Sequence, residues 1–259
     1  MSVVNILIGA KQSLLRTFFV MSLAAVVNAA PITWGTVTDI SNDLSSLNQV
    51  GGIEQAYDLG RTTGGTVTVG GVNFAQDPGT IVTSPSHQTL IDTNISTNDA
   101  FWDPDGAGPL TSPLDSFVWR SNAANGNGDM AITLTGLVVG GDYRVQLFVV
   151  DQRAAGNGRT QTFDDDVPAT PASASVRHNS VPGPGPAHGQ YVIGFFQASA
   201  STQVINIARV GTTTATILNA LILRRVVPEL NVFGAVIPLS LVGLLLLCWA
   251  ERRRIGGLQ

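Results

Sequence analysis

The chain has 259 residues, of which 44% are hydrophobic and only 12% are charged, with 28 glycines, 13 prolines and one cysteine. Residues 30–227 carry nine arginines, no lysine and sixteen acidic side chains, a net charge of −7 that excludes the clustered basic surface needed for nucleic-acid binding. The cysteine, Cys248, lies inside the last apolar run. A domain formed by residues 30–227 therefore has no disulfide and needs a hydrophobic core of its own.

The first 29 residues have the pattern of an export signal. A positively charged segment precedes an apolar stretch over residues 17–27, and small residues follow it. We expect signal peptidase to cut between Ala29 and Ala30, because a cut one residue later would place Pro31 at the scissile bond. An uncleaved anchor is the alternative, but the apolar stretch is short for a membrane span.

Residues 30–227 are predicted to form one extracytoplasmic domain that is mainly β. A short helix is expected within Asp39–Gly52, capped by Ser41 or Asn42. Beyond it, period-2 alternation with turn residues about every 8–12 positions, and no long amphipathic helix, predicts a single antiparallel β-sandwich or a barrel. The clearest strand segments are Thr66–Phe74, Met130–Asp151, Gly189–Ala198, Thr202–Val210 and Thr214–Arg225.

The segment Asn98–Gly108 is the best candidate for a metal site. Asp99, Asp103 and Asp105 offer the hard oxygen ligands that Ca²⁺ prefers. The downstream glutamate of an EF-hand is missing, so a plain Pro-Asp-Gly turn is the alternative interpretation. No other cofactor is expected.

Signatures of enzymes are mostly absent. There is no G-x-S-x-G elbow, no H-E-x-x-H and no phosphate loop. The three histidines, His87, His178 and His188, lie in loop-like sequence and are expected to be solvated. No pair of carboxylates suited to glycoside hydrolysis stands out, since Glu54 is the only glutamate in residues 30–227. We therefore expect no catalysis.

Four residues are candidates for contact with a sugar. Trp102 and Trp119 could each offer an aromatic face, and Asp151 and Arg153 could reach hydroxyl groups after a strand. Trp34 is instead expected to pack on the core, as tryptophans commonly do.

The C-terminal residues contain, in the expected order, the parts of a membrane-inserted tail. Val232–Ala250 is an uncharged run that, as a helix, is about 28 Å long and can cross the hydrocarbon core of a bilayer. Arg252, Arg253 and Arg254 follow it, which places the C-terminus in the cytoplasm and residues 30–227 outside. We expect a precursor inserted in the inner membrane.

This tail, residues 228–259, resembles a PEP-CTERM sorting signal. Pro228 and Glu229 match its motif ahead of the membrane helix and the arginine cluster, although Leu230 stands where the family has a second proline. The resemblance implies recognition by exosortase, a membrane-embedded protease-like enzyme of Gram-negative bacteria that make exopolysaccharide. An ordinary membrane anchor that is never cut is the alternative.

A second resemblance covers roughly residues 32–225. The runs "LTGLVVGGDYRVQLFVVDQR" and "GQYVIGFFQASASTQVINI" are similar to jelly-roll modules of the galactose-binding-like or malectin-like kind. Such modules bind glycans or serve as structural units, and the fold alone implies no activity.

These observations predict an exported, non-catalytic protein of the cell surface or extracellular matrix, with glycan binding as the hypothesis for its work. Its expected partners are signal peptidase, exosortase, the membrane through the terminal helix, and exopolysaccharide. Two alternatives stay open: a secreted carbohydrate-active hydrolase or lyase, and a type I membrane adhesin that keeps its tail.

Overall fold

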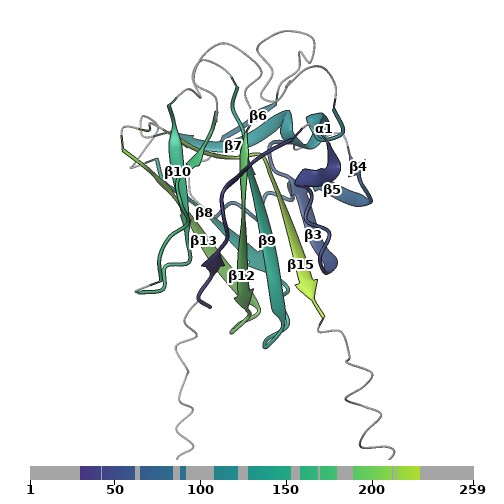
Figure 1. Cartoon of the computed structure of the whole chain (residues 1–259), viewed down its shortest axis with the longest axis vertical. Coiled ribbons are helices and arrows are strands. Elements are labelled where there is room, and N and C mark those ends of the chain that lie inside the picture. Colours follow the sequence, from purple (N-terminus) through teal and green to yellow (C-terminus); the bar gives the residue numbers. More distant parts are fainter. Residues whose placement is uncertain are drawn as a thin grey trace, which may run out of the picture.

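The computed structural model describes most of residues 30–227 (Figure 1). The described ranges are 30–41, 43–61, 65–83, 88–91, 108–121, 128–152, 158–168, 170–179, 189–211, 213 and 215–227. The predicted signal peptide and the whole sorting tail lie outside them. Within the described ranges, no helix combines the length and the apolar character that crossing a membrane requires.

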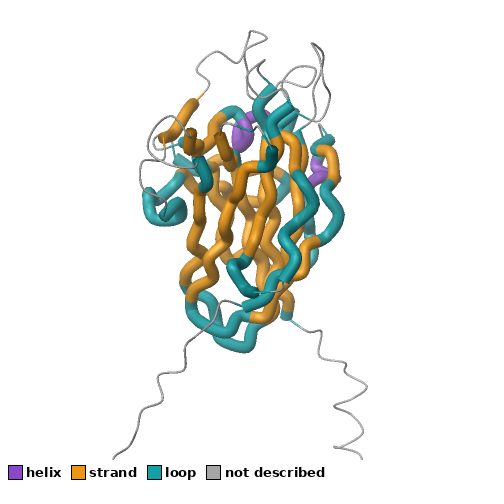
Figure 2. The backbone as a smooth tube through the Cα atoms, turned by 90° about the vertical axis from the view of Figure 1, so that its left-hand side faces the viewer, coloured by secondary structure: helices purple, strands orange, loops and turns teal. Residues whose placement is uncertain are grey.

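The described chain is mainly β and forms three sheets. The largest has eight strands, in the order β1 (Thr33–Trp34), β12 (Gln190–Gln197), β9 (Asp142–Val149), β15 (Ala220–Val226), β3 (Gly52–Asp58), β5 (Val72–Gln76), β4 (Val67–Val69), with β2 (Thr38–Asp39) also beside β12. The second has the order β11 (Val176–Arg177), β10 (Thr160–Asp164), β13 (Thr202–Arg209), β8 (Met130–Thr135). The third has the order β14 (Ala215–Leu218), β7 (Ser116–Ser121), β6 (Gln88–Ile91). Figure 2 shows how little of this part of the chain is helical.

The main core lies between the eight-stranded and four-stranded sheets. Alternate residues of each strand point into it because side chains of a strand alternate between its two faces. From β9 these are Val145, Leu147 and Val149, and from β13 they are Ile205 and Ile207, all with no exposed surface. Each such side chain stabilises the fold by about 2 kcal/mol relative to its exposed state. This alternation is what the sequence pattern predicted.

A second, smaller core covers part of the outer face of the large sheet. The one helical turn, α1 (Thr111–Leu114), and the hairpin β4–β5 pack there against Phe148, Val150 and Ile222. Beside this core, the same face carries Arg144, which is half-buried, and Arg224, which is buried. The start of the described chain and the end of β15 lie at the same end of the molecule, with α1, β6 and β7 at the other (Figure 1).

The predicted helix within Asp39–Gly52 is wrong in extent and in its cap. Only a 3₁₀ turn forms, η1 (Leu44–Ser46), and its cap is Asp43, whose side chain accepts a hydrogen bond from the Ser45 amide. A single turn satisfies too few backbone groups to nucleate a longer helix, and β3 already begins at Gly52.

The predicted strand segments are confirmed in position, with two differences in pairing. Gly70 and Gly71 both have positive φ and form the two-residue turn of the β4–β5 hairpin, as the two glycines indicate. However, β5 then pairs with β3 in parallel, so the large sheet is not purely antiparallel. The chain leaves β3, forms β4, turns back, and then forms β5 beside β3. Because β5 runs in the same direction as β3, their pairing is parallel.

The second difference is a break inside Thr214–Arg225. The segment was predicted as β without a break, and Asn219 divides it into β14 and β15, which belong to different sheets. Asn219 is fully buried, and its side chain accepts from the Val150 amide at 2.7 Å and donates to the Leu114 and Ser116 carbonyls at 3.1 and 3.0 Å. These bonds compensate for burying a polar side chain at the junction of the sheets.

Trp34 packs on the core, as predicted. It is partly buried, and its ring centroid lies 5.9 Å from that of Phe163. The ring lies over Gly194 of the neighbouring strand, where a Cβ would stand 2.8 Å from its Cζ3 atom. The glycine therefore makes room for the indole.

Candidate functional site: an arginine-lined hollow

Most residues singled out from the sequence lie outside the described part of the chain. They are Ala29, Asp99, Trp102, Asp103, Asp105, Arg153, Pro228, Glu229, Arg252, Arg253 and Arg254. The proposed calcium loop is thus outside as well. Among the residues that the structure does describe, no group of three or more His, Cys, Asp or Glu side chains could hold a metal ion.

Three of the predicted site residues are described. Ala30 is buried, and its amide donates to Gln203 Oε1 at 3.0 Å. Trp119, in β7, is half-buried and packs against the main core. Asp151 is fully buried at the end of β9, where its amide donates to the His178 carbonyl at 2.8 Å. This position does not fit direct contact of Asp151 with a ligand at the surface.

The expectation that His178 is solvated is wrong. Its side chain has no exposed surface, and Nε2 lies 2.9 Å from Gln161 Oε1. Gln161 is fixed by two hydrogen bonds to the backbone of Ile217. Its Oε1 accepts from the Ile217 amide at 3.0 Å, and its Nε2 donates to the Ile217 carbonyl at 2.9 Å. Because Oε1 only accepts, His178 Nε2 carries the proton. Burial, and then the charge of Arg159, lower the pKa of His178 to about 3.

Two buried carboxylates share one arginine at the end of β3. Arg61 Nε lies 3.1 Å from Asp58 Oδ2, and its Nη2 donates to both oxygens of Asp115, at 3.1 and 2.9 Å. Asp58 also accepts from the Ser116 hydroxyl at 2.5 Å. Burial raises the pKa of Asp58 to about 6, against the opposing effects of Ser116 and Arg61. This cluster was not predictable from the sequence, because Asp115 lies 54 residues after Arg61 and Ser116 lies 58 residues after Asp58.

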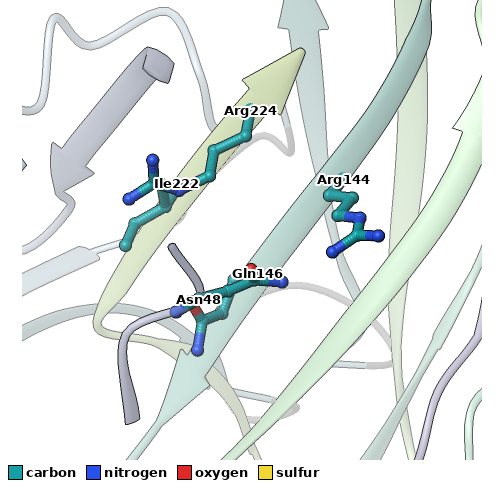
Figure 3. A pocket seen from close by; sticks show the side chains of 5 residues that line it. All are labelled: Asn48, Arg144, Gln146, Ile222 and Arg224. Atoms are coloured by element: carbon teal, nitrogen blue, oxygen red, sulfur yellow. The ribbon is translucent and has the colours of Figure 1, made fainter. Parts of the chain in front are cut away.

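The outer face of the large sheet carries two arginines on neighbouring strands, beside the smaller core. Arg144 of β9 and Arg224 of β15 are direct cross-strand partners and therefore lie on the same face. Together with Asn48, Gln146 and Ile222 they line a hollow of about 150 Å³, a volume that includes its open mouth (Figure 3). The two guanidinium groups extend in different directions, with Gln146 and Asn48 to one side of both (Figure 3).

Arg224 is unusual for an arginine because it is buried and only partly hydrogen-bonded. Its side chain is 5% exposed, and Nη1 donates to the Gly51 carbonyl at 3.0 Å. Its Nε and Nη2 have almost no exposed surface and no hydrogen-bond partner. Burial lowers the pKa of Arg224, but an arginine remains charged at neutral pH.

The neighbours of Arg144 and Arg224 hold the site in shape. Arg144 lies over the ring of Phe195, 5.0 Å from its centroid, in a cation–π contact. Gln146 is fixed because its Oε1 accepts from the Asn48 amide at 3.0 Å and its Nε2 donates to the Ser46 carbonyl. In the described part of the chain neither arginine forms an ion pair with a carboxylate. The hollow is therefore a positive site on an otherwise acidic domain.

Comparisons with known proteins add little to this picture. No family model matches the chain, and no curated protein matches it significantly. Similar solved structures include the ANX1 ectodomain from Arabidopsis thaliana (10% identity, TM-score 0.44), a chain in the complex of the plant peptide RALF23 with FER and LLG2 (14%, 0.46) and the ANX2 ectodomain from Arabidopsis thaliana (13%, 0.45). Each match covers 68% of this chain and 42%, 49% and 50% of the other chain, respectively, so this chain spans half of their length or less. Scores this low carry no argument about its fold or its ligand.

Proposed function

We propose that this protein is an exported, non-catalytic module, a β-sandwich of the jelly-roll kind, which binds extracellular polysaccharide at the cell surface or in the matrix. The observation that carries the proposal is the arginine-lined hollow on the outer face of the large sheet, where Arg224 has two buried nitrogens without a hydrogen-bond partner and where Asn48 and Gln146 also line the surface. Binding sites for small polar ligands typically combine a concave surface with a few fixed polar groups. The resemblance to galactose-binding-like and malectin-like modules supports the same ligand class.

The buried carboxylates support a non-catalytic role over the hydrolase or lyase alternative. Glycoside hydrolysis needs two carboxyl groups that reach the substrate from opposite sides of the scissile bond. Asp58 and Asp115 are both buried and both engaged by Arg61, so this pair is not open to a sugar chain. Release of reducing ends or unsaturated products by the purified chain, abolished by one Asp substitution, would favour the enzyme instead.

Export and sorting rest on the two ends of the sequence. In this proposal, signal peptidase cuts after Ala29, the tail holds the precursor in the inner membrane, and exosortase acts near Pro228 and Glu229. The described chain begins and ends at the same end of the molecule (Figure 1), which is compatible with both processing sites facing one membrane.

Processing is tested by the intact mass and the terminal peptides of the mature protein purified from its own host. We expect an N-terminus at Ala30 and a C-terminus near Glu229, because the helix and arginine cluster hold the motif at the outer surface. A Glu229→Gln variant should keep the peptide Ile255–Gln259 on the chain. Recovery of that peptide from the unmodified protein would favour the permanently anchored adhesin.

Polysaccharide binding is tested with the full-length chain in detergent against a panel of neutral and acidic polysaccharides that includes the host's own exopolysaccharide. We expect retention by at least one of them. Failure to bind any would contradict the proposed function.

A further inference from the structure

We infer that the Arg144–Arg224 hollow binds the carboxylate of an acidic sugar, so that the polysaccharide recognised by this protein contains uronic acid. This inference rests on the proposed polysaccharide-binding function and narrows it to one class of ligand. It depends on three features of the site. They are the unpaired edge of the Arg224 guanidinium, the like charges of Arg144 and Arg224 opposite each other on neighbouring strands, and the small size of the hollow.

The free edge of Arg224 matches a carboxylate. Nη1 is used by the Gly51 carbonyl, and the two nitrogens left without a partner are Nε and Nη2. These two lie side by side on one edge of the guanidinium, and their N–H bonds point in parallel, which is the arrangement that receives both oxygens of a carboxylate. Leaving buried charged donors unpaired costs free energy. An anion that binds this edge removes that cost.

The cross-strand position of Arg144 also favours an anion. Like charges directly opposite each other on neighbouring strands destabilise a sheet. The nearest acidic side chain on the same strand and face is Asp142, two residues from Arg144, and its Oδ1 accepts from Gln197 Nε2 at 3.3 Å. Glu54, exposed in β3, is the other carboxylate near Arg224 along the sheet. Neither forms an ion pair with the two arginines.

The size of the hollow separates the anionic group from the rest of the sugar. About 150 Å³, open mouth included, leaves no room for a ligand atom while the side chains stay in place, and it is small compared with pockets that enclose a whole ligand. The sugar ring therefore lies outside, over Asn48. The Asn48 Oδ1 accepts from the Val50 amide at 2.9 Å, which leaves its Nδ2 as a donor for a hydroxyl. Because Nε and Nη2 of Arg224 have almost no exposed surface, binding also requires a small rotation of that side chain.

The experiment compares two oligosaccharides that differ only in charge. One is a β-1,4-linked glucuronic acid oligomer and the other is the glucose oligomer of the same linkage and length. Titration calorimetry with the full-length chain in detergent should give at least about tenfold tighter binding of the glucuronic acid oligomer. This preference should fall with added salt, because salt screens the attraction between an acidic oligomer and the two arginines as it approaches.

Variants locate the binding. Arg144→Gln should weaken binding of the acidic oligomer about tenfold and leave the neutral oligomer unaffected, because one of the two cations is lost. Arg224→Lys should weaken it comparably, since a lysine keeps the charge but not the two parallel donors. Arg177→Gln, an exposed arginine of β11 in another sheet, is the matched control and should change nothing. Melting temperatures verify that each variant is folded, and if Arg224→Lys is not, Arg144→Gln carries the test.

Each other outcome has a distinct meaning. Equal binding of both oligomers, insensitive to Arg144→Gln, would overturn the carboxylate inference and leave polysaccharide binding intact. Binding of neither oligomer, together with failure on the whole polysaccharide panel, would overturn both proposals. If acetate or free glucuronate bound as tightly as the oligomer, the site would hold a free anion only. Binding of phosphatidylglycerol vesicles in place of the oligomer would show that the two arginines contact lipid headgroups, which also overturns the inference.

Discussion

Replacing Arg61 with methionine is expected to lower the free energy of unfolding at pH 7 by about 3–5 kcal/mol. The substitution removes the only cation described between Asp58 and Asp115, which are 1% and 3% exposed. Two carboxylates would then share a buried site without the arginine between them, which costs more than the loss of the attractive contacts themselves. Urea denaturation followed by tryptophan fluorescence measures the loss.

The matched control is Arg209→Met. It also removes a described ion pair, but Arg209 Nε lies 3.4 Å from Asp129, whose side chain is 37% exposed. A pair of this kind contributes about 1 kcal/mol or less. A second check is the double variant Arg61→Met, Asp58→Asn, which should recover part of the loss because one of the two neighbouring buried negative charges is gone. Equal losses in the Arg61 and Arg209 variants would contradict the role given to the buried cluster.

The pH dependence gives the Arg61 prediction a second test. Burial raises the pKa of Asp58 in the folded state from 3.8 to about 6. A carboxyl with a raised folded-state pKa stabilises the fold below its unfolded value, and this contribution is lost as the pH rises through the folded value. Removing Arg61 raises that pKa further. The loss caused by Arg61→Met should therefore be largest at neutral pH and shrink toward pH 4, where Asp58 is protonated.

The secondary structure was largely predictable from the sequence because strands carry a local signal. Alternation along Gln190–Gln197 and Thr202–Arg209 follows from one face meeting the core, and Gly70-Gly71 specifies a tight turn. Pairing was less predictable, since the parallel contact of β3 with β5 depends on the route of the chain through space. The break at Asn219 had a local signal that could have been used: a lone amide in an otherwise apolar strand needs several buried partners.

The candidate site was not predictable in the same way. Arg144 and Arg224 are 80 residues apart, and only the register of β9 with β15 brings them opposite each other. The alternating sequence of a strand is the same whether its polar face contacts water, a second core or a ligand. A weak signal was available: an arginine in a strand whose neighbours are apolar is expensive to bury unless it has a partner. The prediction that His178 is solvated was wrong because a loop-like sequence can still be buried beneath neighbouring strands.

His178→Leu is expected to make the protein more acid-resistant, with the difference from the unmodified chain growing by about 3 kcal/mol between pH 6 and pH 4. The pKa of His178 is lowered by burial to about 3, from 6.5. A group with a lowered folded-state pKa contributes stability above its unfolded value, and that contribution is lost as the pH falls from 6.5 toward 3. Leucine has a similar volume and no charge, so the variant lacks this loss. Gln161 Oε1 keeps the Ile217 amide as a donor, so no buried acceptor is left unpaired.

In the unmodified chain alone, the effect of His178 on the free energy of unfolding is masked. Protonation of Asp58 changes the stability in the opposite direction over the same pH range. Between about pH 6 and 3.8, acidification gains stability through Asp58 while it loses stability through His178. The informative comparison is therefore between variants, by urea denaturation at pH 7, 6, 5 and 4. Asp58→Asn should lose stability steeply on acidification, since the His178 loss is then uncompensated, whereas His178→Leu should hold or gain stability. Parallel pH profiles for His178→Leu and the unmodified chain would show that His178 is able to take up its proton in the folded state, contrary to its buried position beside Gln161.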